Sequence, residues 1–285
     1  MKKRNLIYIA ISVFCVIAIA AGVYYQIFGQ DDKKPTNNHV SNTQTDGEQI
    51  DDPEEIKEEF NSLFTNMLYE QGYDLSSIQK IAGLENQDIV YAAYNIKEEK
   101  DGKYNVDINL PVFNIAGEKA AEFNANTQSI FANKANDILN NANQYTIYNV
   151  DYVAYMNDQI LSLVIKSILK EGNSAQRIIV QTYNYDVVTG KEVSLNEVLE
   201  AQGYSIKEVN QKIEEQVEEA NKQAEALSQA VSQTGQTVYK RDINNAMYVT
   251  DNVTNFFIGE GGTIYIVYAY GNSNFTSEMD IIKVS

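Results

Sequence analysis

Residue types that carry much of enzyme chemistry are nearly absent from this sequence. Its 285 residues include one cysteine (Cys15), one histidine (His39), no tryptophan and three prolines. One cysteine and one histidine cannot form a disulfide or a Cys/His zinc site within one chain. They also argue against a Ser-His-Asp triad or a Cys-His pair. We therefore predict no catalytic residue, no cofactor and no metal ligand, and a fold that depends on its hydrophobic core.

Basic residues are scarce as well. Lys and Arg total 22 against 39 Asp and Glu, so the formal net charge is −17. Binding a polyphosphate requires a basic face that releases counterions, and this balance argues against nucleic acid as a partner. With so many carboxylates, pairs at glycosidase spacing arise by chance, and none is singled out. A cell-wall hydrolase that uses a carboxylate pair stays open as the alternative to a non-enzymatic protein.

The long uncharged run lies near the N-terminus. Residues 6–28 contain no charge and as a helix would extend about 34 Å, enough to cross a hydrocarbon core of about 30 Å. The basic residues Lys2, Lys3 and Arg4 precede it and predict a cytoplasmic stub at 1–5. Everything after the span would then lie outside, with 19 basic and 39 acidic residues and a formal charge of −20.

A cleaved signal peptide is the alternative to this anchor, and it would give a secreted product. Ala18-Ile19-Ala20 offers small residues of the kind found at a cleavage site. Signal h-regions usually span about 7–15 residues, and this apolar run continues to Phe28. Its length favours a single-pass anchor that contacts the lipid bilayer through residues 6–28.

A polar stretch separates the anchor from the rest of the chain. Residues 30–55 contain too little apolar area to offset their ordering entropy and predict a flexible linker. His39 lies in this linker, where it is not positioned to act as a base. Residues 56–285 show helix and strand patterns without a second linker. They predict one extracytoplasmic α+β domain, or two lobes at about 56–170 and 171–285.

The periodicity of apolar residues predicts an antiparallel sheet with packed helices. Its Arg177–Asp186 strand would direct Tyr183 and Tyr185 to one face and Asn184 to the other. The glycines near 259–262 are followed by no helix, so they predict a turn and not a phosphate loop. The expected helices are 54–68, 117–141 and 205–232, and the expected strands are 89–96, 104–113, 145–156, 159–170, 177–186 and three within 255–284.

The longest expected helix carries a heptad repeat of Ile206, Ile213, Ala220 and Leu227. Such a seam can pair with a partner helix. It can equally lie on the sheet, and we favour this interpretation because the seam is rich in alanine and short for a stable coiled coil.

Tyrosine is abundant, with 20 residues. Most are expected in the core, because aromatic side chains pack well on strands. Tyr265, Tyr268 and Tyr270 fall on one predicted strand near the C-terminus. They are the candidates for an exposed face that binds a sugar or a peptide.

The run Tyr183-Asn184-Tyr185-Asp186, continued by Thr189-Gly190-Lys191, resembles a motif of an extracytoplasmic domain of unknown function in Gram-positive bacteria. That domain occurs N-terminal to the catalytic module of peptidoglycan deacetylases and in anti-sigma factors that sense lysozyme. The resemblance covers about residues 85–284. It implies a structural role for these seven residues, as a strand that ends in a turn.

What the resemblance implies about function is a membrane-anchored, non-enzymatic binding or sensing domain of the cell envelope. Its ligand would be a cell-wall glycan or other wall component, or a basic extracellular protein such as lysozyme. The chain departs from the family because it contains neither the deacetylase metal domain nor a sigma-binding segment. It also reads Tyr268-Ala269-Tyr270-Gly271 where the family usually has Tyr-Glu-Ile-Ala and a glycine.

Overall fold

The computed structural model describes residues 78–231, 238–271 and 277–284, which all belong to one compact unit, Asp51–Ser285. The predicted span 6–28, the linker 30–55 and the helix 54–68 lie outside the described residues. Within those residues, no helix is both long and apolar enough to cross a bilayer. The described part has the α+β architecture that the sequence predicts, with helices packed on sheets that are mostly antiparallel.

A six-stranded sheet forms the first half of the described chain, and its strands follow one another in sequence order. The Lys100–Lys103 turn joins the first two strands, with Gly102 at φ 70°. The third and fourth strands are joined at Asp158, which has φ 51°. The strands are β1 (Val90–Lys100), β2 (Tyr104–Phe113), β3 (Thr146–Asn157), β4 (Ile160–Glu171), β5 (Arg177–Asp186) and β6 (Lys191–Glu192).

One strand pair in this sheet differs from the expected antiparallel pattern. β2 pairs with β3 in parallel, from Tyr104 opposite Thr146 to Ile108 opposite Val150. Parallel neighbours cannot be joined by a tight turn, so the chain crosses over through the helical segment between them. This pairing ends before Pro111. The missing N–H of that proline therefore leaves no hydrogen bond of the β2–β3 ladder unmade.

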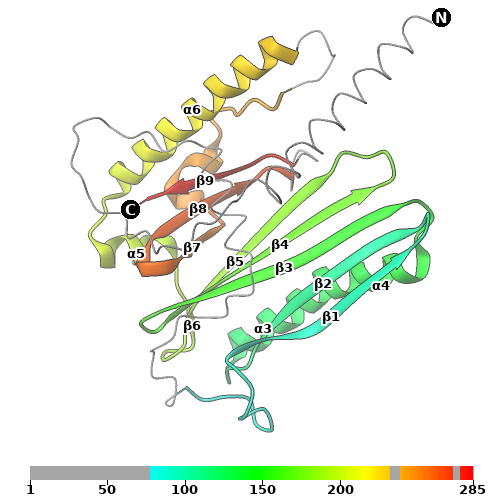
Figure 1. Cartoon of the computed structure of the whole chain (residues 1–285). Helices are drawn as coiled ribbons and strands as arrows, with labels where there is room; N and C mark the ends of the chain where they lie inside the picture. Colours follow the sequence, from blue (N-terminus) through cyan, green and yellow to red (C-terminus); the bar gives the residue numbers. More distant parts are fainter. Residues whose placement is uncertain (1–77, 232–237, 272–276, 285) are drawn as a thin grey trace, which may run out of the picture. The chain divides into compact units, whose positions relative to one another are not determined.

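The crossover consists of α3 (Glu118–Thr127), a π-helical turn η1 (Gln128–Ala132) and α4 (Asn133–Asn141). Figure 1 shows α3 and α4 running along the face of β1, β2 and β3. Phe123, Phe131 and Ile138 are buried against the sheet. Ile130 has an apolar side chain in the same helical segment but is 46% exposed. The π turn inserts one residue into the helical repeat, so the buried stripe passes through Phe131 and Ala132 instead.

The three C-terminal strands form a second sheet, which the sequence does not separate from the first. β7 (Phe256–Ile258), β8 (Ile264–Ala269) and β9 (Met279–Lys283) are antiparallel, in that order. β8 is buried on both faces. Tyr265 and Val267 pack with Val153 and Val164 of the large sheet, whereas the alternate residues of β8 pack in the other direction, toward helices.

Those helices are α5 (Leu195–Gln202) and α6 (Ile206–Val231). Figure 1 places both beside β7, β8 and β9. Ser205 and Glu208 cap the start of α6, with the Glu208 carboxylate accepting from the Ser205 backbone N–H. Ile213 of the heptad seam is buried against the small sheet, whereas Leu227 is 54% exposed. The interpretation that this face lies on a sheet is thus confirmed for the centre of the helix.

Candidate functional site

The motif at Tyr183–Lys191 joins the two sheets. Tyr183 and Tyr185 face the helical crossover, where the ring of Tyr183 meets that of Phe123 edge to face at a centroid distance of 4.4 Å. Asn184 points to the opposite face, because successive side chains of a strand alternate. Its amide donates to the Phe256 carbonyl of β7, and its side-chain oxygen accepts from the Ser162 hydroxyl at 2.6 Å.

Ser162 completes this link because its hydroxyl also accepts from the Ile258 N–H. The backbone of β7 is therefore satisfied in part by side chains of the large sheet. A buried polar group is costly unless it is hydrogen-bonded. The buried backbone groups of β7 therefore explain why polar residues, Ser162 and Asn184, occupy two core positions.

The second half of the motif forms a turn. The Asp186 carboxylate accepts from the backbone N–H groups of Val188 and Thr189, each at 2.9 Å. Gly190 has φ 71°, and a Cβ there would lie 3.3 Å from the Tyr185 hydroxyl. Lys191 then pairs with Asp186 as the chain starts β6. All seven motif residues thus serve the strand, the turn or the link between sheets.

This turn forms one wall of a cleft of about 710 Å³. Three further segments complete the cleft, and each is tied in place by a hydrogen bond. Gln159 after β3 donates to Asp186, Gln202 of α5 donates to the Gly262 carbonyl, and Asn157 donates to the Ile258 carbonyl. The lining residues are 157–160, Asp186, Thr189, 191–193, Glu197, Val198, Ala201, Gln202, Ile258, Gly261 and Gly262.

The cleft is acidic. Four carboxylates line it, from Asp158, Asp186, Glu192 and Glu197, against the single ammonium of Lys191. Hydrogen bonds from the side chain and backbone of Ser194 lower the pKa of Glu197, so this group stays ionised. Ile160, Val198 and Ile258 add apolar area beside the carboxylates. This combination suits a cationic group on a partly apolar carrier, and the cleft is the candidate functional site.

The sequence predicts two of the turns that line this cleft, but not that they lie side by side. The Thr-Gly-Lys turn and the glycine turn near 259–262 are both predicted and both present. As expected, a short 3₁₀ turn (η4, Glu260–Gly262) and no longer helix follows Gly259. What the sequence could not indicate is that Asp158 and α5 meet these turns, since the segments that line the cleft come from two sheets and a helix.

The predicted tyrosine face is not exposed. Tyr265, Tyr268 and Tyr270 are 7%, 4% and 1% exposed. Tyr265 and Tyr268 lie on β8, and Tyr270 follows directly after it. This segment is covered on both sides, by the large sheet and by α6 with its neighbouring segments. The aromatic excess on this strand therefore reflects packing between layers, and the expectation of an open aromatic surface here is corrected.

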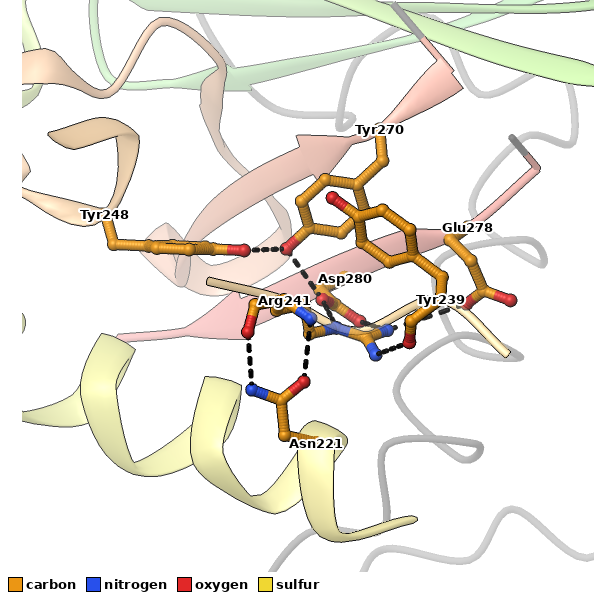
Figure 2. Close-up of polar contacts among 7 residues, drawn as sticks. All are labelled: Asn221, Tyr239, Arg241, Tyr248, Tyr270, Glu278 and Asp280. Carbon is orange, nitrogen blue, oxygen red and sulfur yellow. Dashed lines mark hydrogen bonds and ion pairs between the residues drawn. The ribbon is translucent and has the colours of Figure 1, made fainter. Parts of the chain in front are cut away.

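Tyr270 belongs instead to a buried polar cluster, shown in Figure 2. The Arg241 guanidinium donates to both carboxylate oxygens of Asp280, at 2.5 and 2.8 Å. The Tyr270 hydroxyl donates to the same carboxylate at 2.9 Å and lies 2.7 Å from the Tyr248 hydroxyl. A carboxylate only accepts, so Tyr248 is the donor to Tyr270.

The buried environment of this cluster changes the pKa values of its ionisable side chains. Burial raises the pKa of Tyr248 to about 12. Burial, with the negative charge of Asp280, raises the pKa of Tyr270 as well. For Arg241, burial acts to lower the pKa, but the hydrogen bond and charge of Asp280 outweigh it. Both phenols therefore stay neutral at ordinary pH, and their hydrogen bonds make the cluster a structural tie.

Two neighbouring tyrosines give a matched test of this cluster. Tyr270→Phe removes a hydrogen bond to a buried carboxylate, and we expect the free energy of unfolding to fall by about 1.5–3 kcal/mol. The Tyr268 hydroxyl is buried and has no hydrogen-bond partner among the described residues. Tyr268→Phe should therefore leave stability unchanged or raise it by up to about 1 kcal/mol. Urea denaturation of both variants measures the difference, and equal losses would contradict the assignment.

The described residues offer no group of three or more His, Cys, Asp or Glu side chains arranged to hold a metal ion. Two of the four cleft carboxylates also accept hydrogen bonds within the fold, Asp186 from backbone N–H groups of its turn and Glu197 from the Ser194 N–H at the start of α5. Their arrangement supplies negative charge to a ligand.

No known family and no curated protein matches the sequence of this chain. Some solved structures show a distant likeness to this chain. One, from Pseudomonas aeruginosa, is 12% identical and has a TM-score of 0.36, with 68% of this chain and 86% of that chain covered. Another, from Bacteroides fragilis, is 13% identical and has a TM-score of 0.33, with 67% and 90% covered.

Both of these proteins are DUF3298 family members, and that family is a domain of unknown function. Neither likeness assigns a ligand, a substrate or a partner to this chain, and neither bears on the predicted association with peptidoglycan deacetylases or anti-sigma factors.

Proposed function

We propose that this chain is a membrane-anchored, non-enzymatic binding domain of the bacterial cell envelope. Its acidic cleft would take a cationic group of a basic extracellular protein such as lysozyme. The observation that carries this proposal is the cleft itself, where four carboxylates face one ammonium beside apolar side chains. The anchor and the outward orientation rest on the apolar run 6–28 and its basic flank.

The charge of the whole exterior part supports the same partner class. A domain at −20 outside the membrane repels anionic wall polymers and attracts basic proteins, which raises their association rate. Such long-range attraction is weakened by salt, because the Debye length shortens from about 10 Å at 0.1 M to about 3 Å at 1 M.

Binding of hen lysozyme to the whole chain, held in mild detergent, tests the proposal. We expect the affinity to fall steeply between low and high salt. The variant Asp158→Asn with Glu192→Gln removes two cleft charges, and Asn tolerates the left-handed backbone of position 158. Two exposed ion pairs are each worth up to about 1 kcal/mol, so the dissociation constant should rise about tenfold.

Glu214→Gln with Glu218→Gln is the matched control. Both residues are exposed on α6, neither lines the cleft, and the change in net charge is the same. Equal weakening by the two variants would mean that the overall charge attracts the protein and that the cleft does not. Binding that is absent at low salt, or indifferent to salt, would refute the proposed partner class.

A further inference from the structure

A second concave surface lies on the large sheet, away from the acidic cleft. It is a groove of about 510 Å³ on the face opposite the helical crossover. Seven of its nine lining residues are polar or charged, and it shares no residue with the cleft. The lining residues are Asn95, Lys97, Asp107, Asn109, Asn149, Val150, Asp151, Lys166 and Ile168.

Strand alternation explains why polar groups gather here. On β2, Val106, Ile108 and Leu110 turn inward to the helices, so Asp107 and Asn109 turn the other way. The register then sets two rows across four strands. Lys97 lies opposite Asp107, which lies opposite Asn149, and the second row begins with Asn95 opposite Asn109.

The second row continues to β4, because Asp151 of β3 lies opposite Lys166. The Asn109 amide donates to the Asp151 carboxylate at 3.1 Å and joins the row across the parallel strands. Neighbouring strands lie about 4.8 Å apart, so each row extends about 14 Å. The groove is therefore a rigid, regular array of donors and acceptors on a hydrogen-bonded sheet.

Two acceptors in the groove have no donor. The side-chain oxygens of Asn109 and Asn149 are buried and lack a hydrogen-bond partner among the described residues. Buried polar atoms are nearly always hydrogen-bonded, and each exception calls for an explanation such as an ordered water or a bound ion. A ligand that donates hydrogen bonds into the groove would satisfy both oxygens.

The charges of the groove narrow the class of ligand. Two lysines, Lys97 and Lys166, balance two aspartates, Asp107 and Asp151. Lys97 and Asp107 pair directly at 2.8 Å. A balanced surface favours neither a polyanion nor a polycation. With only Val150 and Ile168 as apolar contributors, it also gives little area for an apolar side chain.

A peptide is disfavoured for a second reason. Extended peptides usually bind sheets by adding a strand at an open edge. This groove lies on the face of four strands whose backbone groups pair with one another. Recognition here must come from side chains, and alternating carboxylate, amide and ammonium groups match the adjacent hydroxyls of a sugar.

We propose that this groove binds a neutral, polyhydroxylated ligand, namely a glycan chain laid across strands β1 to β4. The inference goes beyond the proposed function and does not depend on it, because the groove and the cleft have separate linings. The chain would then have one surface for a cationic group and another for a glycan.

Titration calorimetry of the whole chain in mild detergent tests this, with cellotetraose and chitotetraose as probes. We expect saturable binding of at least one of them at submillimolar to millimolar concentration. Asn149→Leu removes an acceptor, and Lys97→Met removes an exposed donor. Loss of one such hydrogen bond should raise the dissociation constant about three- to tenfold.

Two controls make the outcome clear. Asn149→Leu removes an oxygen that has no partner, so its unfolding midpoint should not fall, and weaker binding could not be blamed on misfolding. Asp158→Asn with Glu192→Gln, in the other cleft, should leave the oligosaccharide affinity unchanged. The absence of saturable binding to both probes, or equal binding by the Asn149→Leu variant and the unmodified chain, would overturn the proposal. The proposal would also be overturned if the Asn149→Leu variant lost binding to a lysine-rich peptide but kept its binding to both oligosaccharides.

Discussion

The Asp280→Ala variant is expected to lose about 3–5 kcal/mol of its free energy of unfolding. The side chains of Arg241 and Asp280 are only 4% and 7% exposed. Removal of the carboxylate leaves the guanidinium buried without its anion, which costs far more than the ion pair itself contributes. The Tyr270 hydroxyl loses its acceptor in the same step. Urea denaturation of the whole chain in mild detergent measures the loss.

A double variant separates two contributions to stability: the cost of a buried charge without its partner, and the net contribution of the ion pair itself. Asp280→Leu with Arg241→Met replaces both charges by apolar groups, and most of the lost stability should return. The backbone of Arg241 stays anchored in this variant, because its N–H and C=O bind the Asn221 side chain. If the double variant were as unstable as Asp280→Ala, an uncompensated buried charge would not be the cause.

Glu278→Gln is the control on the same guanidinium. Its carboxylate lies 3.5 Å from Arg241 but is 36% exposed, and partly exposed ion pairs are worth roughly 0–1 kcal/mol. A loss for Glu278→Gln as large as that for Asp280→Ala would contradict the assignment of Asp280 as the main counterion.

The second large effect is expected on α6. Ile213→Ala should reduce the free energy of unfolding by about 2–5 kcal/mol, because Ile213 is fully buried in the core that α6 forms with the small sheet. Leu227 occupies the same heptad position two repeats later but is largely exposed. Leu227→Ala should change stability by less than about 0.5 kcal/mol. Thermal or urea midpoints of the two variants give the comparison.

Light scattering on the same variants checks the coiled-coil alternative. A partner helix along the heptad seam would make both residues part of an interface, and Leu227→Ala would then shift the mass of the particle. We expect the mass to be unchanged, because the centre of the seam already packs on the chain's own sheet. A change in mass with Leu227→Ala and no loss of stability with Ile213→Ala would reverse this conclusion.

The elements themselves follow from local features of the sequence. Strand alternation at Arg177–Asp186 predicts which faces Tyr183 and Asn184 occupy, and the structure confirms both. Gly102 and Asn157-Asp158 mark turns that are present. Ser194 caps the start of α5, and Glu197 completes a capping box there. These features depend on neighbours a few residues apart, so the sequence contains the physical cause.

Tertiary structure alone decided how these elements combine. Whether β2 and β3 run in parallel depends on the path of the crossover between them. Periodicity also could not tell that β7 to β9 leave the large sheet and bury Tyr265, Tyr268 and Tyr270 between layers. An apolar strand has the same sequence pattern whether one face or both are covered, because burial is set by segments far away in the chain.

The two candidate binding surfaces also combine features that the sequence contains with features that only the fold creates. The sequence determined that the chain is acidic, that polar residues alternate along β2, and that a turn follows Asp186. Only the fold brought Asp158 and Glu192 into one cleft and aligned the Lys97 and Asn95 rows across four strands. Charge and alternation are properties of single segments. A concave site instead requires segments distant in sequence to meet, and long-range packing determines which ones do.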